Sequence, residues 1–158
     1  MLRLNSIIRF PGYSLACFDG ADIAGGSLKC LDALDYRWYF NYGEGSNTIA
    51  ELLGAWATLT IAKCLEIQHI HVLGDSKVIV DWLNQIMNLQ AINIEGWKIK
   101  IRDLATTFQG INFQHIFREY NEEADKLSKQ ALSSPKGRLT YFTWHGENVG
   151  PTQHLNIF

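Results

Sequence analysis

Four acidic residues stand where a predicted strand ends or a predicted helix begins: Asp19, Glu51, Asp75 and Asp125. The ends of adjacent strands and the starts of the helices that cover them converge at one edge of an open α/β sheet, where ligand sites form. Carboxylates gathered there repel one another unless a cation neutralises them, and oxygen-only ligands favour magnesium or manganese over zinc. Two such ions, about 3.5–4 Å apart, activate a water molecule and stabilise the leaving oxygen of a phosphodiester.

Each of these acids has a plainer interpretation when it is considered alone. An acidic residue at the start of a helix most often caps the helix or compensates the positive end of its dipole. For Glu51, in the first turn of its predicted helix, and for Asp125, this interpretation is the more frequent one. The placement of all four acids at separate element ends is what favours a shared metal site.

The elements that must position these acids follow from the periodicity of the sequence. The predicted order is β-β-β-α-β-α-α-β-α, with strands over 13–19, 25–31, 36–42, 67–73 and 112–118, and helices over 48–65, 77–86 and 94–108 and after Asn121. Residues 138–144 are predicted to form a further extended piece, and 151–158 a tail. No repeat or linker divides the chain. We therefore expect one α/β domain over 1–158 with a mixed sheet, its core over about 13–132 and a C-terminal tail over 133–158.

The composition limits the classes of protein to which the chain can belong. Its 158 residues are 47% hydrophobic and 19% charged, too apolar for a disordered chain and too polar for a membrane protein. The longest mainly apolar stretch, over 52–62, is about half of the roughly 20 residues that a spanning helix needs, and no signal peptide is apparent. Three cysteines without a CxxC pair argue against a disulfide framework or a zinc site. We expect an intracellular protein, in the nucleus or cytoplasm, with no membrane contact.

The net charge of −2 argues at first against a nucleic-acid substrate, because nucleic-acid-binding domains are usually basic. Two divalent cations held by the four acids would bring the charge to about +2. Binding of a nucleic acid is therefore predicted to depend on metal as well as on Lys and Arg.

The residues around the four acids resemble the motifs of the ribonuclease H family. Residues 18–21 (FDGA) are similar to its first-strand motif, 46–52 (SNTIAEL) to its TNxxAE motif, 74–76 to its GDS motif, and 115–127 to its HVxREyNxxADxL motif. The four motifs occur in the family's order, and the resemblance covers about 13–132. The phrase AELLGAWATL resembles the plant-type domain found in retroelement reverse transcriptases.

The resemblance implies a ribonuclease H-like fold, with a five-stranded mixed sheet and helices on both faces. It implies catalysis by Asp19, Glu51, Asp75 and Asp125, which would hold two Mg²⁺ ions, with Mn²⁺ as a substitute. The implied reaction is hydrolysis of the RNA strand of an RNA/DNA hybrid, leaving a 5′-phosphate and a 3′-hydroxyl. The implied substrate contacts are Gly20, Ser46, Asn47, Thr48, Ser76 and Arg118. A monomeric domain excised from a reverse transcriptase polyprotein fits this picture.

Two departures from the family pattern leave alternatives open. The glycine-rich segment after the first strand is reduced to 22–26, and no histidine lies between Arg118 and Asp125. Arg118, His145 and His154 are candidates to replace that histidine. The alternatives are a non-catalytic nucleic-acid-binding module that retains the fold, and another nuclease of the same superfamily.

Overall fold

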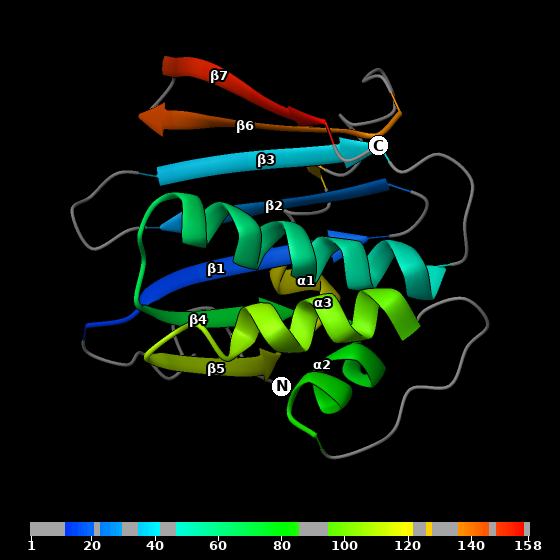
Figure 1. Ribbon diagram of the computed structural model, residues 1–158. Helices are drawn as coiled ribbons and strands as arrows, with labels where there is room; N and C mark the ends of the chain where they lie inside the picture. The colour runs from blue at the N-terminus through cyan, green and yellow to red at the C-terminus, as the bar shows by residue number, and fades with distance from the viewer. Residues whose placement is uncertain are drawn as a thin grey trace.

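The computed structural model describes residues 12–20, 23–29, 35–41, 47–85, 95–121, 126–127, 136–145 and 148–156. They form one seven-stranded mixed sheet in the order β5-β4-β1-β2-β3-β6-β7 (Figure 1). The first three strands, β1 (Ser14–Gly20), β2 (Ile23–Lys29) and β3 (Asp35–Asn41), form an antiparallel meander. On the other side of β1, β4 (His69–Gly74) and β5 (Gly110–His115) run parallel to it, so the carboxyl ends of these three strands lie at the same edge.

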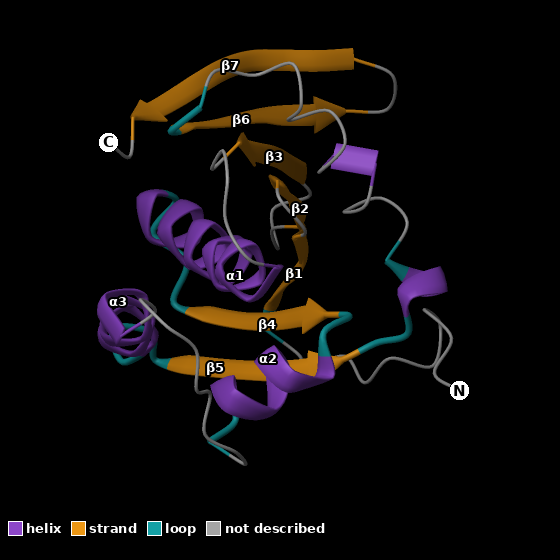
Figure 2. Ribbon diagram, turned by 90° about the vertical axis from the view of Figure 1, so that its right-hand side faces the viewer, coloured by secondary structure: helices purple, strands orange, loops and turns teal. Residues whose placement is uncertain are grey.

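Three helices lie on one face of the sheet. Helix α1 (Asn47–Cys64) packs on β1 and β2, and α3 (Glu95–Ala105) packs against α1 (Figure 2). The two helices meet in an edge-to-face contact of Trp56 and Trp97. The short helix α2 (Lys77–Leu83) packs against β4 and β5. Most apolar side chains of α1 are buried, because the helix lies between the sheet and α3, while Ile49 and Trp56 are half-buried. The three helices predicted over 48–65, 77–86 and 94–108 are present, but α2 and α3 end earlier than predicted, at Leu83 and Ala105.

The chain after β5 crosses to the other face of the sheet. A single turn of 3₁₀ helix, η2 (Arg118–Tyr120), and the helical pair Lys126–Leu127 lie there, opposite α1 (Figure 2). The remainder of the last predicted helix lies outside the described residues. Helices and helical turns thus occur on both faces, as the sequence predicted.

The strand count is seven, whereas the sequence predicted five. Segments 138–144 and 151–158, expected as an extended piece and a tail, contribute to a hairpin of β6 (Arg138–His145) and β7 (Asn148–Asn156) that pairs with β3. The tail prediction was wrong because the Gly150-Pro151 pair at its start is typical of a loop. Here that pair lies in an edge strand, where Pro costs no ladder hydrogen bond.

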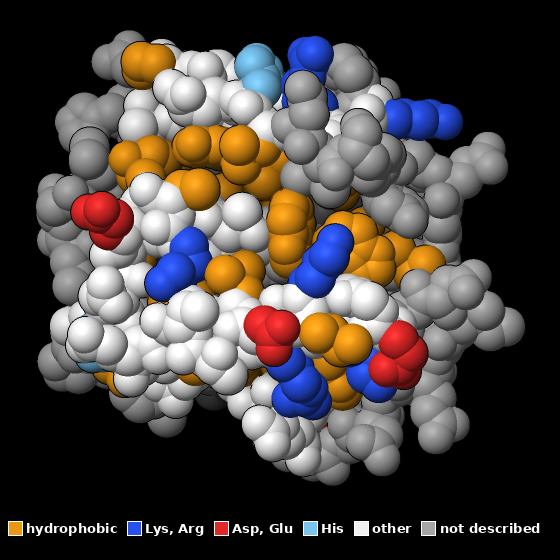
Figure 3. All heavy atoms as spheres, in the orientation of Figure 1, with side chains coloured by type: hydrophobic (Ala, Val, Ile, Leu, Met, Phe, Trp, Pro, Cys, Tyr) orange, Lys and Arg blue, Asp and Glu red, His pale blue; other side chains and the backbone are white. Residues whose placement is uncertain are grey.

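The hairpin widens the sheet beyond the reach of α1. Figure 3 shows a band of apolar side chains on the α1 face, over β3 and β6 and beside the helix. Tyr36, Tyr141 and Leu155 are half-buried there and pack against the main core. Among the described helices, none is long and apolar enough to cross a membrane.

Two glycines bring α1 and β4 close to the end of β1. A methyl group at Gly54, one turn after Glu51, would lie 3.0 Å from Cδ2 of the buried Phe18. A methyl group at Gly74 would lie 2.8 Å from Cζ of the same ring and 3.4 Å from Val80 Cγ2. Phe18 thus fills the space between the strand ends and α1, and it precedes Asp19 directly.

This packing makes Gly74→Ala a destabilising change. Because the Phe18 ring is enclosed and cannot move aside, we expect the free energy of unfolding to fall by about 1–3 kcal/mol in urea titrations. Gly96→Ala is the matched control, because nothing lies within 4 Å of a methyl group at that position of α3 and alanine favours a helix. Equal effects of the two substitutions would contradict this account.

Candidate active site

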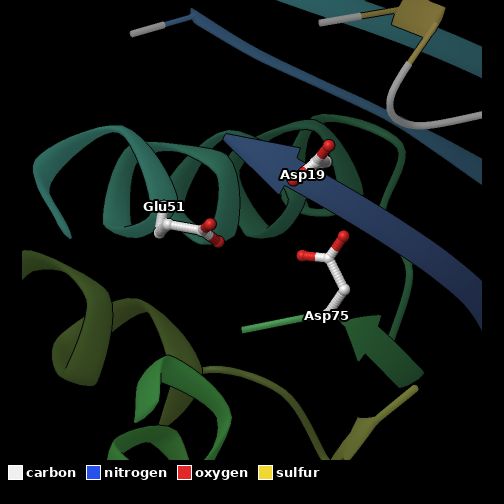
Figure 4. A group of neighbouring side chains, drawn as sticks. All are labelled: Asp19, Glu51 and Asp75. Carbon is white, nitrogen blue, oxygen red and sulfur yellow. The ribbon is translucent and has the colours of Figure 1, made fainter. Parts of the chain in front are cut away.

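The structure brings three of the four predicted acids together at the edge where β1 and β4 end. Asp19 is the penultimate residue of β1, Asp75 follows β4 directly, and Glu51 reaches over from α1 (Figure 4). One carboxylate oxygen from each of the three lies within 4.8 Å of the others. Asp19 is buried, and Glu51 and Asp75 are half-buried. Asp125 lies outside the described residues.

Glu51 lies deeper in its helix than the sequence indicated. Helix α1 begins at Asn47 and has no acidic residue in its first turn, so the expectation of a first-turn position was wrong. The favourable interaction of an acid with the helix dipole is confined to that first turn. Capping or dipole compensation therefore does not account for Glu51, and its placement beside Asp19 and Asp75 needs another explanation.

Burial and like charge both act on Glu51. Burial raises the pKa of this carboxyl from 4.5 to about 9, with further contributions from the negative charges of Asp75 and Asp19, while the Arg118 guanidinium acts in the opposite direction. The folded protein without metal therefore keeps Glu51 protonated at neutral pH. A carboxyl group whose pKa is raised by burial and by neighbouring acids is typical of a functional site.

The donor atoms fit a hard divalent cation. Glu51 Oε2 and Asp75 Oδ2 are buried and have no hydrogen-bond partner among the described residues, which is costly for a polar atom unless a ligand satisfies it. All donors in the group are carboxylate oxygens, the type that Mg²⁺ and Mn²⁺ prefer. Such a cation would also offset the repulsion that raises the pKa of Glu51.

The predicted substrate contacts fall in different places. Gly20 is the last residue of β1, where it pairs with Ala24. Thr48 is half-buried in the first turn of α1, and Ser76 is half-buried between Asp75 and α2. Ser76 occupies the N-cap position of α2, but its side chain makes no capping hydrogen bond. Ser46 and the side chain of Asn47 lie outside the described residues.

Of the three candidates for the missing histidine, only Arg118 lies near the acids. It is exposed in η2, and its charge acts on Glu51. His154 lies on β7, four strands from β1, and contacts the Thr140 hydroxyl at 3.0 Å. His145 belongs to β6, three strands from β1. Because neighbouring strands are about 4.8 Å apart, neither His145 nor His154 can reach the acids.

Two further residues contact the backbone beside these acids. The His115 ring lies 3.1 Å from the backbone oxygen of Asp75, and the Asn121 side chain donates to the backbone oxygen of Phe18 at 2.8 Å. Both residues lie in the motif over 115–127, but neither was among the site residues predicted from the sequence. Their position in the sequence could have indicated this role, because they lie at the two ends of the segment between β5 and the last predicted helix.

The chain has the fold of several solved ribonuclease H structures. The N-terminal RNase H domain of Rv2228c from Mycobacterium tuberculosis, solved as a fusion with maltose-binding protein, superposes with a TM-score of 0.64 at 23% identity, over 77% of this chain and 95% of that one. RNase H1 of Halobacterium salinarum superposes with a TM-score of 0.62 at 22% identity, over 78% of this chain and 99% of that one. LC11-RNase H1 in complex with an RNA/DNA hybrid superposes with a TM-score of 0.64 at 20% identity, over 76% of this chain and 99% of that one.

The family described as reverse transcriptase-like matches residues 38–131, more than half of the chain. The chain belongs to this family. The bifunctional protein Rv2228c of M. tuberculosis is 28% identical over 92 residues, which are 58% of this chain and 25% of that protein. The match thus spans about a quarter of the curated relative's length.

Proposed function

We propose that this chain is a ribonuclease H that hydrolyses the RNA strand of RNA/DNA hybrids. The observation that carries the proposal is the gathering of Asp19, Glu51 and Asp75 within 4.8 Å, with buried oxygens on Glu51 and Asp75 that lack partners among the described residues. The ribonuclease H names of the similar structures, one of them bound to an RNA/DNA hybrid, support the choice of substrate.

The four predicted acids have distinct proposed roles in a site for two divalent cations. Asp19 and Asp75, at the ends of neighbouring parallel strands, would anchor the ions, while Glu51 from α1 and Asp125 would complete their ligand sets. Bound Mg²⁺ or Mn²⁺ would lower the pKa of the attacking water and offset the charge that develops on the phosphodiester. Glu51 must lose its proton before it serves as a ligand, which links metal binding to pH.

The residues around the acids would position the substrate. Gly20, Thr48 and Ser76 border Asp19, Glu51 and Asp75 in the chain, and Ser46 and Asn47 precede α1 or begin it. Short polar side chains suit recognition of a ribose 2′-hydroxyl, the group that distinguishes RNA from DNA. Arg118 is exposed and would contact a phosphate of the scissile strand.

We also propose that the chain is a single, monomeric domain of retroelement origin that acts within the cell as the ribonuclease H part of a reverse transcriptase. The family description supports this origin, and the plant-type phrase over 50–59 agrees with it. Light scattering on the purified chain tests the monomeric state.

A panel of nucleic acids tests the proposed reaction. Purified protein with Mg²⁺, and separately with Mn²⁺, is incubated with labelled RNA/DNA hybrid, single-stranded RNA, DNA duplex and RNA duplex. We expect cleavage of the hybrid alone, with product ends that carry a 5′-phosphate and a 3′-hydroxyl. Cleavage of DNA duplex would favour another nuclease of the superfamily, and hybrid binding without cleavage in either metal would favour a non-catalytic module.

A further inference from the structure

His115, the last residue of β5, and Asn121 contact the backbone at the ends of β4 and β1, next to Asp75 and Asp19. The ladder between β1 and β4 ends at the pair Phe18–Gly74, and the ladder between β4 and β5 ends at Gly74–His115. The next N–H group, that of Ile116, still donates to the Gly74 backbone oxygen at 2.9 Å. Beyond this point β1 still pairs with β2 as far as Gly20–Ala24, but among the described residues no further backbone pair joins β1 to β4.

We propose that His115 and Asn121 are positioning residues that set the separation of the Asp19 and Asp75 carboxylates. The proposal rests on the proposed function, because those carboxylates matter as a pair only if they hold metal together. His115 contacts the backbone oxygen of Asp75 itself, and Asn121 contacts that of Phe18, the residue before Asp19. One short segment therefore holds both strand ends at once.

The geometry of Asn121 suits this role. Its side chain is buried, and its own N–H donates to the Arg118 backbone oxygen at 2.9 Å, which closes the η2 turn. The amide thus joins η2 to β1 across 103 residues of sequence. Replacement by an apolar residue leaves the Phe18 carbonyl without this buried donor, and an unsatisfied buried group weakens the structure locally.

The geometry of His115 defines its protonation. A backbone carbonyl can only accept a hydrogen bond, so the ring nitrogen Nε2 that faces Asp75 carries the proton. The ring is half-buried, and its edge-to-face contact with Phe117, at 5.9 Å between centroids, restricts its orientation. A donor at this point restricts the Asp75 backbone, from which the carboxylate projects.

Groups that orient metal ligands without touching the metal typically change metal affinity or activity by about 10–100-fold when they are removed. We therefore expect His115→Leu and Asn121→Leu to weaken Mn²⁺ binding, measured by calorimetry without substrate, by about 10-fold or more. His115→Gln should stay within about 3-fold of the original protein, because the glutamine amide places an N–H near the former Nε2. At saturating metal, KM for the hybrid should be unchanged.

Matched controls separate positioning from general damage. Asn84→Leu removes a side-chain amide that donates to the Phe113 backbone oxygen on the same strand β5, and His154→Leu removes a histidine on the distant strand β7. Both should bind Mn²⁺ normally. Circular dichroism and thermal melting check that each variant folds, and the two His115 variants keep the test decisive if Asn121→Leu does not fold.

The possible failures can be told apart. If the unaltered chain binds Mn²⁺ and cleaves the hybrid, but the Leu variants at 115 and 121 bind as tightly, the positioning role is refuted and the proposed function stands. Equal losses in His115→Gln and His115→Leu also refute it. If the unaltered chain neither binds Mn²⁺ nor cleaves the hybrid, the proposed function fails, and the positioning role fails with it.

Discussion

Asp19→Asn is expected to reduce cleavage of the RNA/DNA hybrid by about 10³-fold or more, which corresponds to about 4 kcal/mol of lost transition-state stabilisation. Asparagine keeps the size of the side chain and one oxygen but removes the charge that would hold a divalent cation. Asp19 is 6% exposed at the end of β1, so solvent cannot replace it. The measurement is the single-turnover rate on labelled hybrid at saturating Mg²⁺.

The control for this substitution is Asp103→Asn, which removes an exposed carboxylate from α3 and should leave the rate unchanged. Thermal melting without metal distinguishes lost chemistry from unfolding. A melting temperature close to that of the original chain would show that the variant is folded and that the loss lies in the chemistry. A variant that cleaves the hybrid as fast as the original chain would refute the assigned role of Asp19.

The second large effect concerns pH and Glu51. In the metal-free protein, the folded state keeps the Glu51 proton up to about pH 9, whereas the unfolded chain releases it near the ordinary value of 4.5. Between these values the folded state binds more protons, so the stability that this group contributes declines as pH rises through the window. Glu51→Gln cannot ionise, and its stability should not show this decline.

Urea unfolding in a chelator, at intervals from pH 5 to pH 9, measures the difference. We expect Glu51→Gln to become progressively more stable than the original chain as pH rises, by at most about 1.4 kcal/mol per pH unit. Mg²⁺ should stabilise the original chain, increasingly so at higher pH, and should not stabilise the variant. Parallel pH curves for the two proteins in chelator would show that Glu51 ionises normally.

Helix α1 and strands β1 and β4 show what periodicity predicts well. Three local patterns predicted these elements: apolar residues all round 48–65, alternation over 13–19 and an apolar run over 67–73. They assigned Glu51, Asp19 and Asp75 to the correct elements. The position of Glu51 within α1 was the exception, because helix starts depend on caps that a sequence pattern locates only to within a few residues.

The β6–β7 hairpin shows where local patterns mislead. Gly150 and Pro151 are typical of loops, and the pairing of β7 with β6 shifts register there. The strand pairs with β6 on both sides of this irregularity, and Leu139 of β6 lies fully buried in the core. Pairing to β3 compensates for the weak strand propensity of this segment, because β propensity depends mainly on packing against neighbours. The decisive contacts come from β3, about one hundred residues earlier in the chain.

The sequence by itself determined that Asp19 and Asp75 stand at strand ends, the chemistry that oxygen ligands allow and the order of most elements, because each depends on residues near one another in the chain. Only the tertiary structure decided that Asp19, Glu51 and Asp75 meet within 4.8 Å, that burial keeps Glu51 protonated, and that His115 and Asn121 hold the strand ends. These features depend on burial and on contacts across 24 to 103 residues, which no local pattern encodes.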